Sequence, residues 1–481
     1  MERGGVMGRK RSDLVLEGEE VVFASEGVKE ERRFISEGKG SVEVLMERAA
    51  EGIFTVALEC IKGEGLTGEV VVLCGKGNNG GDAALVGKKL AGAGFQVTAH
   101  KIFDLLDGSG VEFPENGLVI DGIFGTGFRG EVTGIAKDVI EKLNASPNFV
   151  LAIDIPSGVC GDSGIVEGVA VDADVTVYIG SLKVGHFYNN GFDHVGKLVR
   201  VDIGLFFTLQ PFANVVNRGI VPNNLPRRRR TANKYSVGQV LAIAGSPGMA
   251  GSAILAATAA LKSGAGIVKV FHPLGMECEF SKAPPEIIKR PFSNSEPILE
   301  ELYRTKAILV GCGLGRGEAI PKMLDELYKI AKCPFVIDGD ALFFFQGGVK
   351  QVILTPHKGE LYHLLKIKKP TSDLKLLELA QEFANQNDLV LVCKGAPTTI
   401  VAKNFPKIVV PYGNCGMASA GMGDVLAGII AAFLAQGKNL REAAILGVTV
   451  HALAGDVAKE VKSEYSLVAS DLIRALSEVF K

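Results

Sequence analysis

Glycines and polar side chains follow three apolar runs in the first half of the chain. The runs 69–74, 117–121 and 149–154 are typical of buried strands, and each one leads into such a loop. Backbone amides in a glycine-rich turn can bind phosphate, and aspartates can give or take protons. The carboxyl ends of parallel strands meet in one crevice, so three such loops favour a site, although Asp and Asn also occur as plain turn residues. The loops contain Asn78, Asn79, Gly80, Gly81, Asp82, Asp121, Gly125, Thr126, Gly127, Asp154 and Ser157.

A longer glycine- and alanine-rich stretch, 414–428, lies in the second half and leads directly into an apolar helical pattern. The pattern predicts a buried helix that begins close to Asp424. The first turn of a helix carries free N–H groups, and glycines there let an anion approach them. A carboxylate beside such a phosphate cradle can take a proton from a hydroxyl group. The alternative is an ordinary glycine-rich helix start with Asp424 as a capping residue.

Two further loops of the second half follow predicted strands. The first, 355–360, places His357 and Glu360 at a strand end, where a ligand contact is favoured over a structural histidine. The second, 394–398, offers an ammonium group, glycine backbone and a hydroxyl, which suit nucleotide phosphates. His451 lies in an apolar helical run and is predicted to be a core residue.

Strands and helices alternate through both halves, which predicts an α/β fold with two doubly wound domains. A predicted helical region, 29–58, precedes the first sheet, with Val44, Leu45, Ala49, Ile53, Val56 and Ala57 as core positions. The chain has 481 residues, 47% of them hydrophobic, which is enough for two or three domains. No sequence period relates the halves, so we expect a fusion rather than a repeat. The predicted limits are 1–212 (with 1–28 poorly patterned), a linker 213–231, and 232–481.

The predicted linker contains two prolines and the arginine run 227–230. Arginine runs can bind RNA or phosphate. Without interleaved aromatic residues, a solvated linker or an interdomain clamp is favoured.

Charge and cysteine content narrow the class of protein. The formal net charge of -2 gives no sign of a nucleic-acid partner. The eight cysteines form no C-x-x-C pair and are predicted to be buried thiols in a reducing compartment. No apolar run is long enough to span a membrane, and no secretory signal is recognised. We therefore expect a cytoplasmic protein without nucleic-acid or membrane partners.

The blocks GKGNNGGD, DGIFGTGFRGE, IDIPSGVCGDSG and VTVYIGSLKVG, within about 29–205, resemble the NAD(P)H-hydrate epimerases. This resemblance implies a Rossmann-like domain in which Asp154 is the candidate acid or base. Lys183 matches a family lysine of less certain role. Ala83 and Cys160 depart from the family pattern without removing a polar group of the site. The implied substrate-binding residues are Asn78, Asn79, Gly80, Gly81, Asp82, Gly125, Thr126, Gly127, Phe128, Arg129, Gly130 and Glu131, and the implied K⁺ ligands are Asn79, Asp121 and Ser157.

The blocks AGSPGMAGSAILAA, GCGLG, LTPHKGE, CKGAPT and AGMGDVLAG, within about 235–478, resemble the NAD(P)H-hydrate dehydratases, which are relatives of the ribokinase-like kinases. The resemblance implies that Asp424 deprotonates the substrate hydroxyl. It also implies ADP as co-substrate, with Mg²⁺ near the acids Asp338 and Asp340. Phe343 stands where the family often has Asn. The implied substrate-binding residues are Gly313, Gly315, Thr355, Pro356, His357, Lys358, Gly359, Glu360 and Leu361. The implied ADP-binding residues are Lys394, Gly395, Ala396, Pro397, Thr398, Asn414, Cys415, Gly416, Met417, Ala418, Ser419, Ala420, Gly421, Met422 and Gly423.

Together the resemblances imply a bifunctional repair enzyme for hydrated NADH and NADPH. The first domain would epimerise the R and S hydrates, and the second would dehydrate the S hydrate at the expense of ADP through a phosphorylated intermediate. A homo-oligomer is the expected assembly. Two alternatives stay open, namely a small-molecule kinase of the ribokinase type and a first half that serves only as a binding module, as similar domains do in RNA-processing scaffolds.

Overall fold

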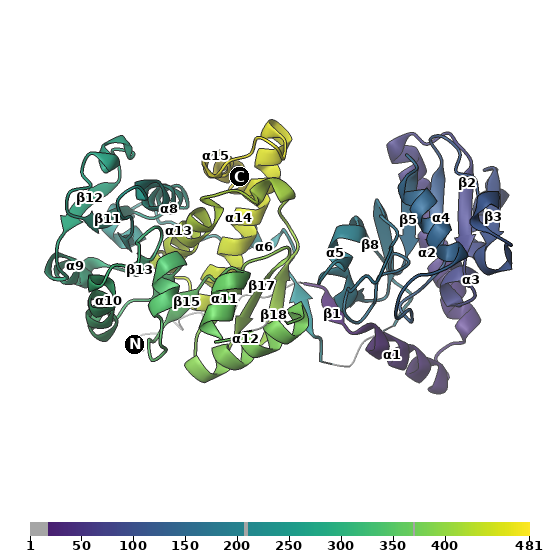
Figure 1. The fold of residues 1–481 in the computed structure, drawn as a ribbon, viewed down its shortest axis with the longest axis horizontal. Coiled ribbons are helices and arrows are strands. Elements are labelled where there is room, and N and C mark those ends of the chain that lie inside the picture. The colour runs from purple at the N-terminus through teal and green to yellow at the C-terminus, as the bar shows by residue number, and fades with distance from the viewer. Residues whose placement is uncertain (1–17, 206–209, 369–370) are drawn as a thin grey trace, which may run out of the picture. The chain divides into compact units, whose positions relative to one another are not determined.

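The computed structural model describes residues 18–205, 210–368 and 371–481. The chain forms two compact units, one containing residues 19–214 and the other residues 215–370 and 377–481. We refer to them as the N-terminal and C-terminal units, and Figure 1 shows a sheet flanked by helices in each. The fold class is therefore α/β, as the alternation of patterns predicts.

A parallel sheet in the order β3-β2-β4-β5-β6-β8 forms the centre of the N-terminal unit. β2 lies between β3 and β4, so the chain reverses direction across the sheet at this point. In doubly wound sheets such a switch point opens the crevice in which ligands bind. The strands are β2 (Val70–Cys74), β3 (Val97–Lys101), β4 (Leu118–Gly122), β5 (Phe149–Ile153), β6 (Val175–Ile179) and β8 (Lys197–Val201).

Helices cover both faces of this sheet, because successive side chains of a strand point to opposite faces. Val70 and Val72 pack with the helices α2 (Val42–Glu64) and α3 (Asn78–Gly92). Val71 and Leu73 pack on the other face with α4 (Ile135–Asn144). Because both faces of β2 are covered, all of its residues are buried, and its sequence is one continuous apolar run.

The predicted helical region 29–58 is in fact two helices, α1 (Ala24–Ser36) and α2, separated near Gly38, which has a positive φ of 72°. Ser41 begins α2 by accepting a hydrogen bond from the amide of Val44. The prediction of Val44 as a core residue is wrong, since 42% of the residue is exposed in the first turn of α2. Leu45, Ala49, Ile53, Val56 and Ala57 are buried as predicted.

The poorly patterned segment 1–28 lies only partly within the described residues. Its described part holds the buried Val21 and Val22 in β1 (Glu20–Val22) and the start of α1. β1 pairs in parallel with β7 (Leu182–Lys183) and antiparallel with β9 (Ala213–Val215). A short helix, α5 (Gly191–His194), precedes β8.

The C-terminal unit contains a second sheet, in which the run of strands β12-β11-β10-β13-β14-β15-β16 is parallel and β17 and β18 continue antiparallel. Figure 1 shows α8, α13 and α14 next to these strands. The strands are β10 (Gln239–Ile243), β11 (Ile267–Pro273), β12 (Ile288–Phe292), β13 (Ala307–Val310), β14 (Phe335–Ile337), β15 (Val352–Leu354), β16 (Val390–Cys393), β17 (Thr398–Ala402) and β18 (Phe405–Val410). The helices are α6 (Ile220–Asn224), α7 (Lys234–Val237), α8 (Ala250–Lys262), α9 (Glu296–Glu301), α10 (Ala319–Ile330), α11 (Lys358–Leu364), α12 (Asp373–Asn387), α13 (Met422–Ala435), α14 (Leu440–Lys462) and α15 (Ala469–Val479).

The helix α13 is the central helix of this unit, and every residue from Val425 to Ala435 is buried. It packs against α8 so closely that a Cβ on Gly428 would lie 2.1 Å from the carbonyl oxygen of Ala256. The alanines and glycines of both helices therefore allow contact between backbones. The helix begins at Met422, close to the predicted start, and so fixes the position of Asp424 in its first turn.

Part of the predicted linker 213–231 is folded. It contains β9 and α6, and Val216, Ile220 and Val221 belong to the apolar core of the C-terminal unit. Arg227 to Arg230 are all exposed, and Arg228 donates a hydrogen bond to the carbonyl of Gly264. The domain limits remain a prediction.

In the described part of the chain, no helix is both long enough and apolar enough to cross a membrane. All eight cysteines are free thiols, as predicted. The prediction that they are buried is wrong for Cys278 and Cys415, which are exposed because they lie outside the apolar strands, in a turn and at the start of a short 3-10 helix.

Candidate functional sites

The turn after β2 brings the backbone to the amino end of α3 with little space for side chains. A Cβ on Gly75 would lie 1.8 Å from the carbonyl oxygen of Ile123, and one on Gly80 would lie 2.1 Å from that of Gly75. Helix α3 begins at Asn78, with Gly77 at its N-cap. The glycines thus leave the first amides of the helix open to a ligand at the sheet's switch point.

Asp154 follows β5 with φ +63° and is held by backbone and side-chain contacts. Its Oδ1 accepts hydrogen bonds from the amide of Ile179, at 2.9 Å, and from Nζ of Lys183. Lys183 also donates to the carbonyl of Ile179 and is 5% exposed. The structure therefore brings together the two residues that the sequence singles out for catalysis in this unit. The buried ion pair and the hydrogen bond from Ile179 fix the orientation of the Asp154 carboxyl group.

His186, which the sequence analysis does not single out, forms hydrogen bonds with the backbone of both members of this pair. Its Nδ1 accepts from the amide of Lys183, so its Nε2–H donates to the carbonyl of Asp154 at 2.8 Å. Burial, together with the charge of Lys183, lowers the pKa of His186 to about 4. The imidazole is therefore neutral at physiological pH, and its role is to fix the backbone on both sides of the ion pair.

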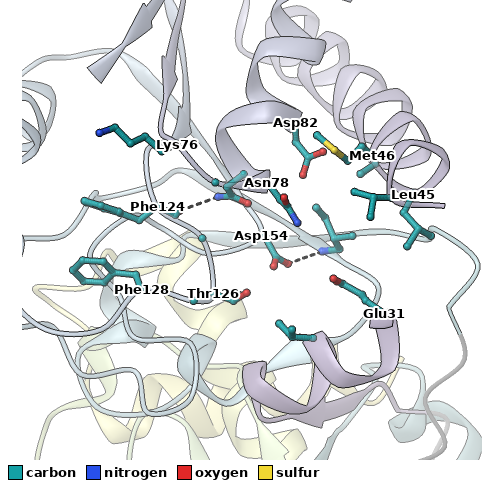
Figure 2. Close-up of a pocket in the computed structure, with 18 of the residues that line it drawn as sticks. Glu31, Leu45, Met46, Lys76, Asn78, Asp82, Phe124, Thr126, Phe128 and Asp154 are labelled. Atoms are coloured by element: carbon teal, nitrogen blue, oxygen red, sulfur yellow. Dashed lines mark hydrogen bonds between the residues drawn. The ribbon is translucent and has the colours of Figure 1, made fainter. Parts of the chain in front are cut away.

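A cavity of about 590 Å³ opens above Asp154 and is lined by α1, α2, the turn after β2 and the loop after β4. Figure 2 shows the carboxyl groups of Glu31, Asp82 and Asp154 around one space. Asp82 is 5% exposed, and its Oδ1 has no hydrogen-bond partner. Burial, and then the charges of Asp154 and Glu31, raise the pKa of Asp82 to about 7. Burial and Asp154 also raise the pKa of Glu31. Three carboxyl groups thus share the cavity, and the pKa is raised for two of them, Asp82 and Glu31.

Asp82→Asn is expected to stabilise the protein at alkaline pH, because ionised Asp82 is buried without a cationic partner of its own. The pKa rises from 3.8 to about 7 on folding, so the native state binds more protons and loses stability as pH rises through this window. Each pKa unit corresponds to about 1.4 kcal/mol, which sets an upper limit of about 4 kcal/mol at pH 8. Calorimetric unfolding should show a gain that is full at pH 8 and absent at pH 4. Asp138→Asn, on the exposed side of α4, is the matched control. An equal gain at both pH values would contradict this account.

Asp121, Ser157 and Asn79 form a buried cluster of oxygen atoms beside this cavity. Oδ1 of Asp121 accepts from the hydroxyl of Ser157 at 2.6 Å, and Oδ2 accepts from the amide of Ser157. The Nδ2 of Asn79 donates to the carbonyls of Phe124 and Ile153 at 2.8 Å each. Asp121 is fully buried, and burial raises its pKa to about 6. In the described part of the chain, no basic side chain is paired with it.

The loop after β4 is only partly turned toward the cavity. Gly125, Thr126, Gly127 and Phe128 line it, and the rings of Phe124 and Phe128 lie 4.5 Å apart. Arg129 instead donates to the carbonyls of Thr126 and Phe128 and pairs with Asp162. Gly130 and Glu131 do not line the cavity, and the backbone of Glu131 forms an isolated parallel β-bridge with Glu167.

A second acidic centre lies in the C-terminal unit, formed by residues that follow β14 and β16 and by the first turn of α13. Asp338 accepts hydrogen bonds at Oδ1 from Thr355, at 2.6 Å, and from Nζ of Lys394, at 2.8 Å. Three side-chain atoms lie within 4.8 Å of one another, namely Sγ of Cys312 and one carboxylate oxygen each of Asp338 and Asp424. A Cβ on Gly423 would lie 3.2 Å from Nζ of Lys394, so the start of α13 lies directly above the ammonium group.

Burial and neighbouring charges shift the pKa values of Asp424 and Lys394 in this centre. Burial, followed by the charge of Asp338, raises the pKa of Asp424 to about 6. Burial alone would lower the pKa of Lys394, but the carboxylates of Asp338 and Glu360 outweigh it and raise the pKa. Asp424 is thus a stronger base than a surface aspartate and remains ionised at neutral pH.

The loop after β15 lies against the loop after β16, since the amide of Lys394 donates to the carbonyl of Pro356. His357 caps α11, with Nδ1 accepting from the amides of Gly359 and Glu360 while Glu360 accepts from the amide of His357. His357 thus has a structural role at the helix start. Its Nε2 lies 3.5 Å from Oε1 of Glu360, and the residue is exposed.

The remaining predicted contacts of this unit lie on separate loops. Gly313 and Gly315 have positive φ angles, and a Cβ on Gly313 would lie 2.9 Å from the carbonyl oxygen of Met249. Asp340 accepts from the amide of Gly315 and from Arg316, whose guanidinium lies 3.4 Å from the ring centre of Phe343. The aromatic ring where the family often has Asn therefore stacks against an arginine.

The stretch 414–423 has two parts. Asn414 donates to Asp456 of α14, and Gly416 packs against the backbone of Glu464. Ala418, Ser419 and Ala420 are exposed just before the helix start. Of the residues implied to bind ADP, Gly423 is adjacent to Lys394, whereas Asn414 and Gly416 contact α14 and the segment that follows it.

Four further residues of these sites are not singled out as functional by the sequence analysis. Glu31 enters the first cavity from α1, and His186 supports Asp154. Cys312 and Ser252 contact Asp424 through hydrogen bonds that lower its pKa slightly against the effect of burial. A pattern of the form G-C-G after a strand could have directed attention to Cys312, whereas nothing in the chain order indicates the others.

Two doubly wound domains, each with a buried acid–lysine pair at the carboxyl ends of its strands, define a two-site α/β enzyme. The C-terminal unit has the fold of the ribokinase-like class. A ribokinase-like protein from Enterococcus faecalis matches it with a TM-score of 0.52 and 26% identity, over 58% of this chain and 97% of that one.

Comparisons with known families identify both parts. Residues 240–478 match the family model of the NAD(P)H-hydrate dehydratases, and residues 42–112 and 103–185 match that of the YjeF-related protein N-terminus. The bifunctional NAD(P)H-hydrate repair enzyme of Moorella thermoacetica is 32% identical, over 91% of this chain and 92% of the relative. The enzyme of the same name from Escherichia coli is 30% identical, over 90% and 89%. The chain belongs to the family of bifunctional NAD(P)H-hydrate repair enzymes.

Proposed function

We propose that the N-terminal unit interconverts the R and S epimers of hydrated NADH and NADPH, and that the C-terminal unit dehydrates the S epimer with ADP as co-substrate. The observation that carries this proposal is the pair of independent acid centres. Asp154 with Lys183 lies in one unit, and Asp424 with Asp338 and Lys394 lies in the other. Family membership supports the assignment of the two reactions.

In the dehydratase, Asp424 takes the proton of the substrate hydroxyl. The hydroxyl oxygen then attacks the terminal phosphorus of ADP, and AMP leaves with the electrons of the broken P–O bond. The new phosphate ester is a better leaving group than hydroxide. Phosphate therefore departs with the C–O bonding electrons, a proton is lost from the neighbouring ring carbon, and the double bond returns. The amino end of α13 and the ammonium of Lys394 stabilise the negative charge on the phosphates.

ADP would be held by Lys394–Thr398 and Asn414–Gly423, and the hydrate by Gly313, Gly315 and Thr355–Leu361. Asp338 would hold Mg²⁺, and the proximity of its carboxylate to that of Asp424 supports this assignment. Two adjacent carboxylates suit a hard divalent cation. Bound Mg²⁺ would neutralise phosphate charge.

In the epimerase, inversion at the carbinol carbon requires a bond to be broken and remade on the other face. Asp82, with its pKa of about 7, is suited to protonate the departing hydroxyl, which leaves as water. Asp154, oriented by its ion pair with Lys183, is suited to take a proton from the water that adds to the opposite face. Environments that separate the pKa values of neighbouring carboxyl groups are the usual basis of such a division of roles.

Asn79, Asp121 and Ser157 would hold K⁺ beside this cavity. Their oxygen atoms are hard ligands, and the fully buried Asp121 has no basic partner in the described structure, so a cation would relieve its burial penalty. Bound K⁺ would contribute positive charge near the substrate.

The test of the combined function is restoration of reduced-nicotinamide absorbance. The full-length protein should restore it from pure S hydrate with ADP, and from R hydrate with a lag that reflects epimerisation. The same assay with ATP in place of ADP measures the nucleotide dependence. Absence of recovery together with stable phosphorylation of a vitamin or sugar would instead establish a ribokinase-type kinase.

A further inference from the structure

A second hollow of the N-terminal unit, about 710 Å³ in volume, adjoins the cavity of Asp154. It is formed by α3, the face of β3 beside it and the turn after β2. Lys76, Gly77 and Phe103 line both spaces. The carboxylates of the first cavity, Glu31, Asp82 and Asp154, do not line this hollow, and the proposed epimerisation assigns no role to it.

We propose that this hollow binds the adenosine half of the substrate and recognises its 2′-phosphate, so that the epimerase prefers hydrated NADPH over hydrated NADH. This inference rests on the proposed epimerase function of the same unit and specifies its substrate.

Size and continuity support the assignment. Sites for ligands of drug size have volumes of roughly 300–1,000 Å³. A dinucleotide consists of two nucleotide halves joined by a diphosphate, and the first cavity, with Asp154, has room for the nicotinamide half. Gly77, at the N-cap of α3, borders both spaces, so a diphosphate that crossed between them would pass the open amides of the helix start.

The topology places a lysine at the position that selects between NAD and NADP in doubly wound folds. There, an acidic residue at the end of the strand after the glycine turn binds the ribose 2′-hydroxyl, and a basic residue nearby accommodates a 2′-phosphate. In this chain that strand is β3, which pairs with β2 and ends in Lys101. Lys101 lines the hollow.

The charges of the lining also fit a phosphate. Lys76, Lys88 and Lys101 line the hollow, with Asp104 as the one carboxylate among its lining residues. In the described part of the chain, none of these lysines forms an ion pair. Lys89, the sequence neighbour of Lys88, differs by pairing with Glu47 and Glu51 on α2. Three lysines and one carboxylate leave a net charge of two, and a phosphate monoester carries nearly two negative charges at pH 7.

Part of the lining of the hollow consists of small apolar side chains and one aromatic ring. Ala84 and Ala91 of α3 and Ala99 of β3 line it, and Phe103, at the junction of the two spaces, is 37% exposed. Small side chains leave room for a flat base, and an aromatic ring at the edge can stack on it.

The experiment measures epimerisation of the pure R hydrates of NADPH and NADH by chromatography of the two epimers. Full-length protein with Asp424→Asn is used throughout, so that the S epimer is not consumed. Lys88→Ala/Lys101→Ala is expected to lower kcat/KM for the NADPH hydrate by about 10- to 100-fold, since charged hydrogen bonds are lost. The value for the NADH hydrate should change by no more than about twofold. Lys89→Ala should leave both values unchanged, and 2′,5′-ADP should inhibit the parent protein at lower concentration than 5′-AMP.

Equal losses on both hydrates, or equal inhibition by 2′,5′-ADP and 5′-AMP, would overturn the inference and leave the epimerase function standing. Failure of the parent protein to epimerise either hydrate would overturn both. A selective loss on the NADPH hydrate would support the lysine pair as the site that recognises the 2′-phosphate.

Discussion

Asp424→Asn is expected to lower the dehydratase turnover by about 10²- to 10⁴-fold, the usual contribution of a general base. The change keeps the size of the side chain and removes the group that accepts the hydroxyl proton. Epimerisation should proceed at the rate of the unaltered protein, because Asp154 and Lys183 belong to the other unit. The measurement is the return of reduced-nicotinamide absorbance from S hydrate and ADP, alongside epimer analysis of the R hydrate.

The pH dependence of the same reaction gives a second check on Asp424. Its raised pKa of about 6 means that the carboxylate is protonated, and unable to accept a proton, below that pH. The dehydratase kcat/KM should therefore fall as pH drops through about 6. Asp325→Asn, an exposed partner of Lys329 on α10, is the control for loss of a carboxylate in this unit. Loss of both activities by Asp424→Asn in a folded protein would contradict independent sites.

Asp154→Asn is expected to reduce epimerisation by a similar factor, about 10²- to 10⁴-fold, and to leave dehydration of S hydrate intact. It should also destabilise the N-terminal unit. Lys183 is 5% exposed, and removal of its partner leaves a buried ammonium without a counter-charge, at a cost of about 3–5 kcal/mol.

A double variant separates these two effects. Asp154→Asn/Lys183→Met removes both charges, so most of the lost thermal stability should return in calorimetry while epimerisation stays absent. If the double variant regains epimerisation, Asp154 acts only on stability. If Asp154→Asn leaves epimerisation unchanged and the protein binds RNA, the first half is a binding module rather than an enzyme.

Much of the fold follows from local sequence patterns. The core of each sheet is a parallel array, whose buried strands give continuous apolar runs such as Val70–Cys74 and Ala307–Val310. Polar and glycine-rich loops after such runs predict candidate ligand-binding turns, and Asp154 stands in one of them, whereas Asp424 lies in the first turn of α13. The division of the region 29–58 into α1 and α2 could not be predicted, because the helical pattern continues across the break near Gly38. The exposure of Val44 could not be predicted either, because it depends on what α2 packs against.

The sequence by itself determined the alternation of strands and helices, the two domain types, and the candidate aspartates Asp154 after a strand and Asp424 at a helix start, because these depend on residues close together in the chain. Only the tertiary structure decided which carboxyl groups share a cavity and what their protonation is. Glu31 comes from α1, Asp82 from α3 and Asp154 from the end of β5, and burial together with the charge of Asp154 raises the pKa values of Glu31 and Asp82. Likewise, the proximity of Cys312 to Asp338 and Asp424 arises from three separate loops. Burial and distance through space are properties of the packed chain, and no local pattern of residues contains them.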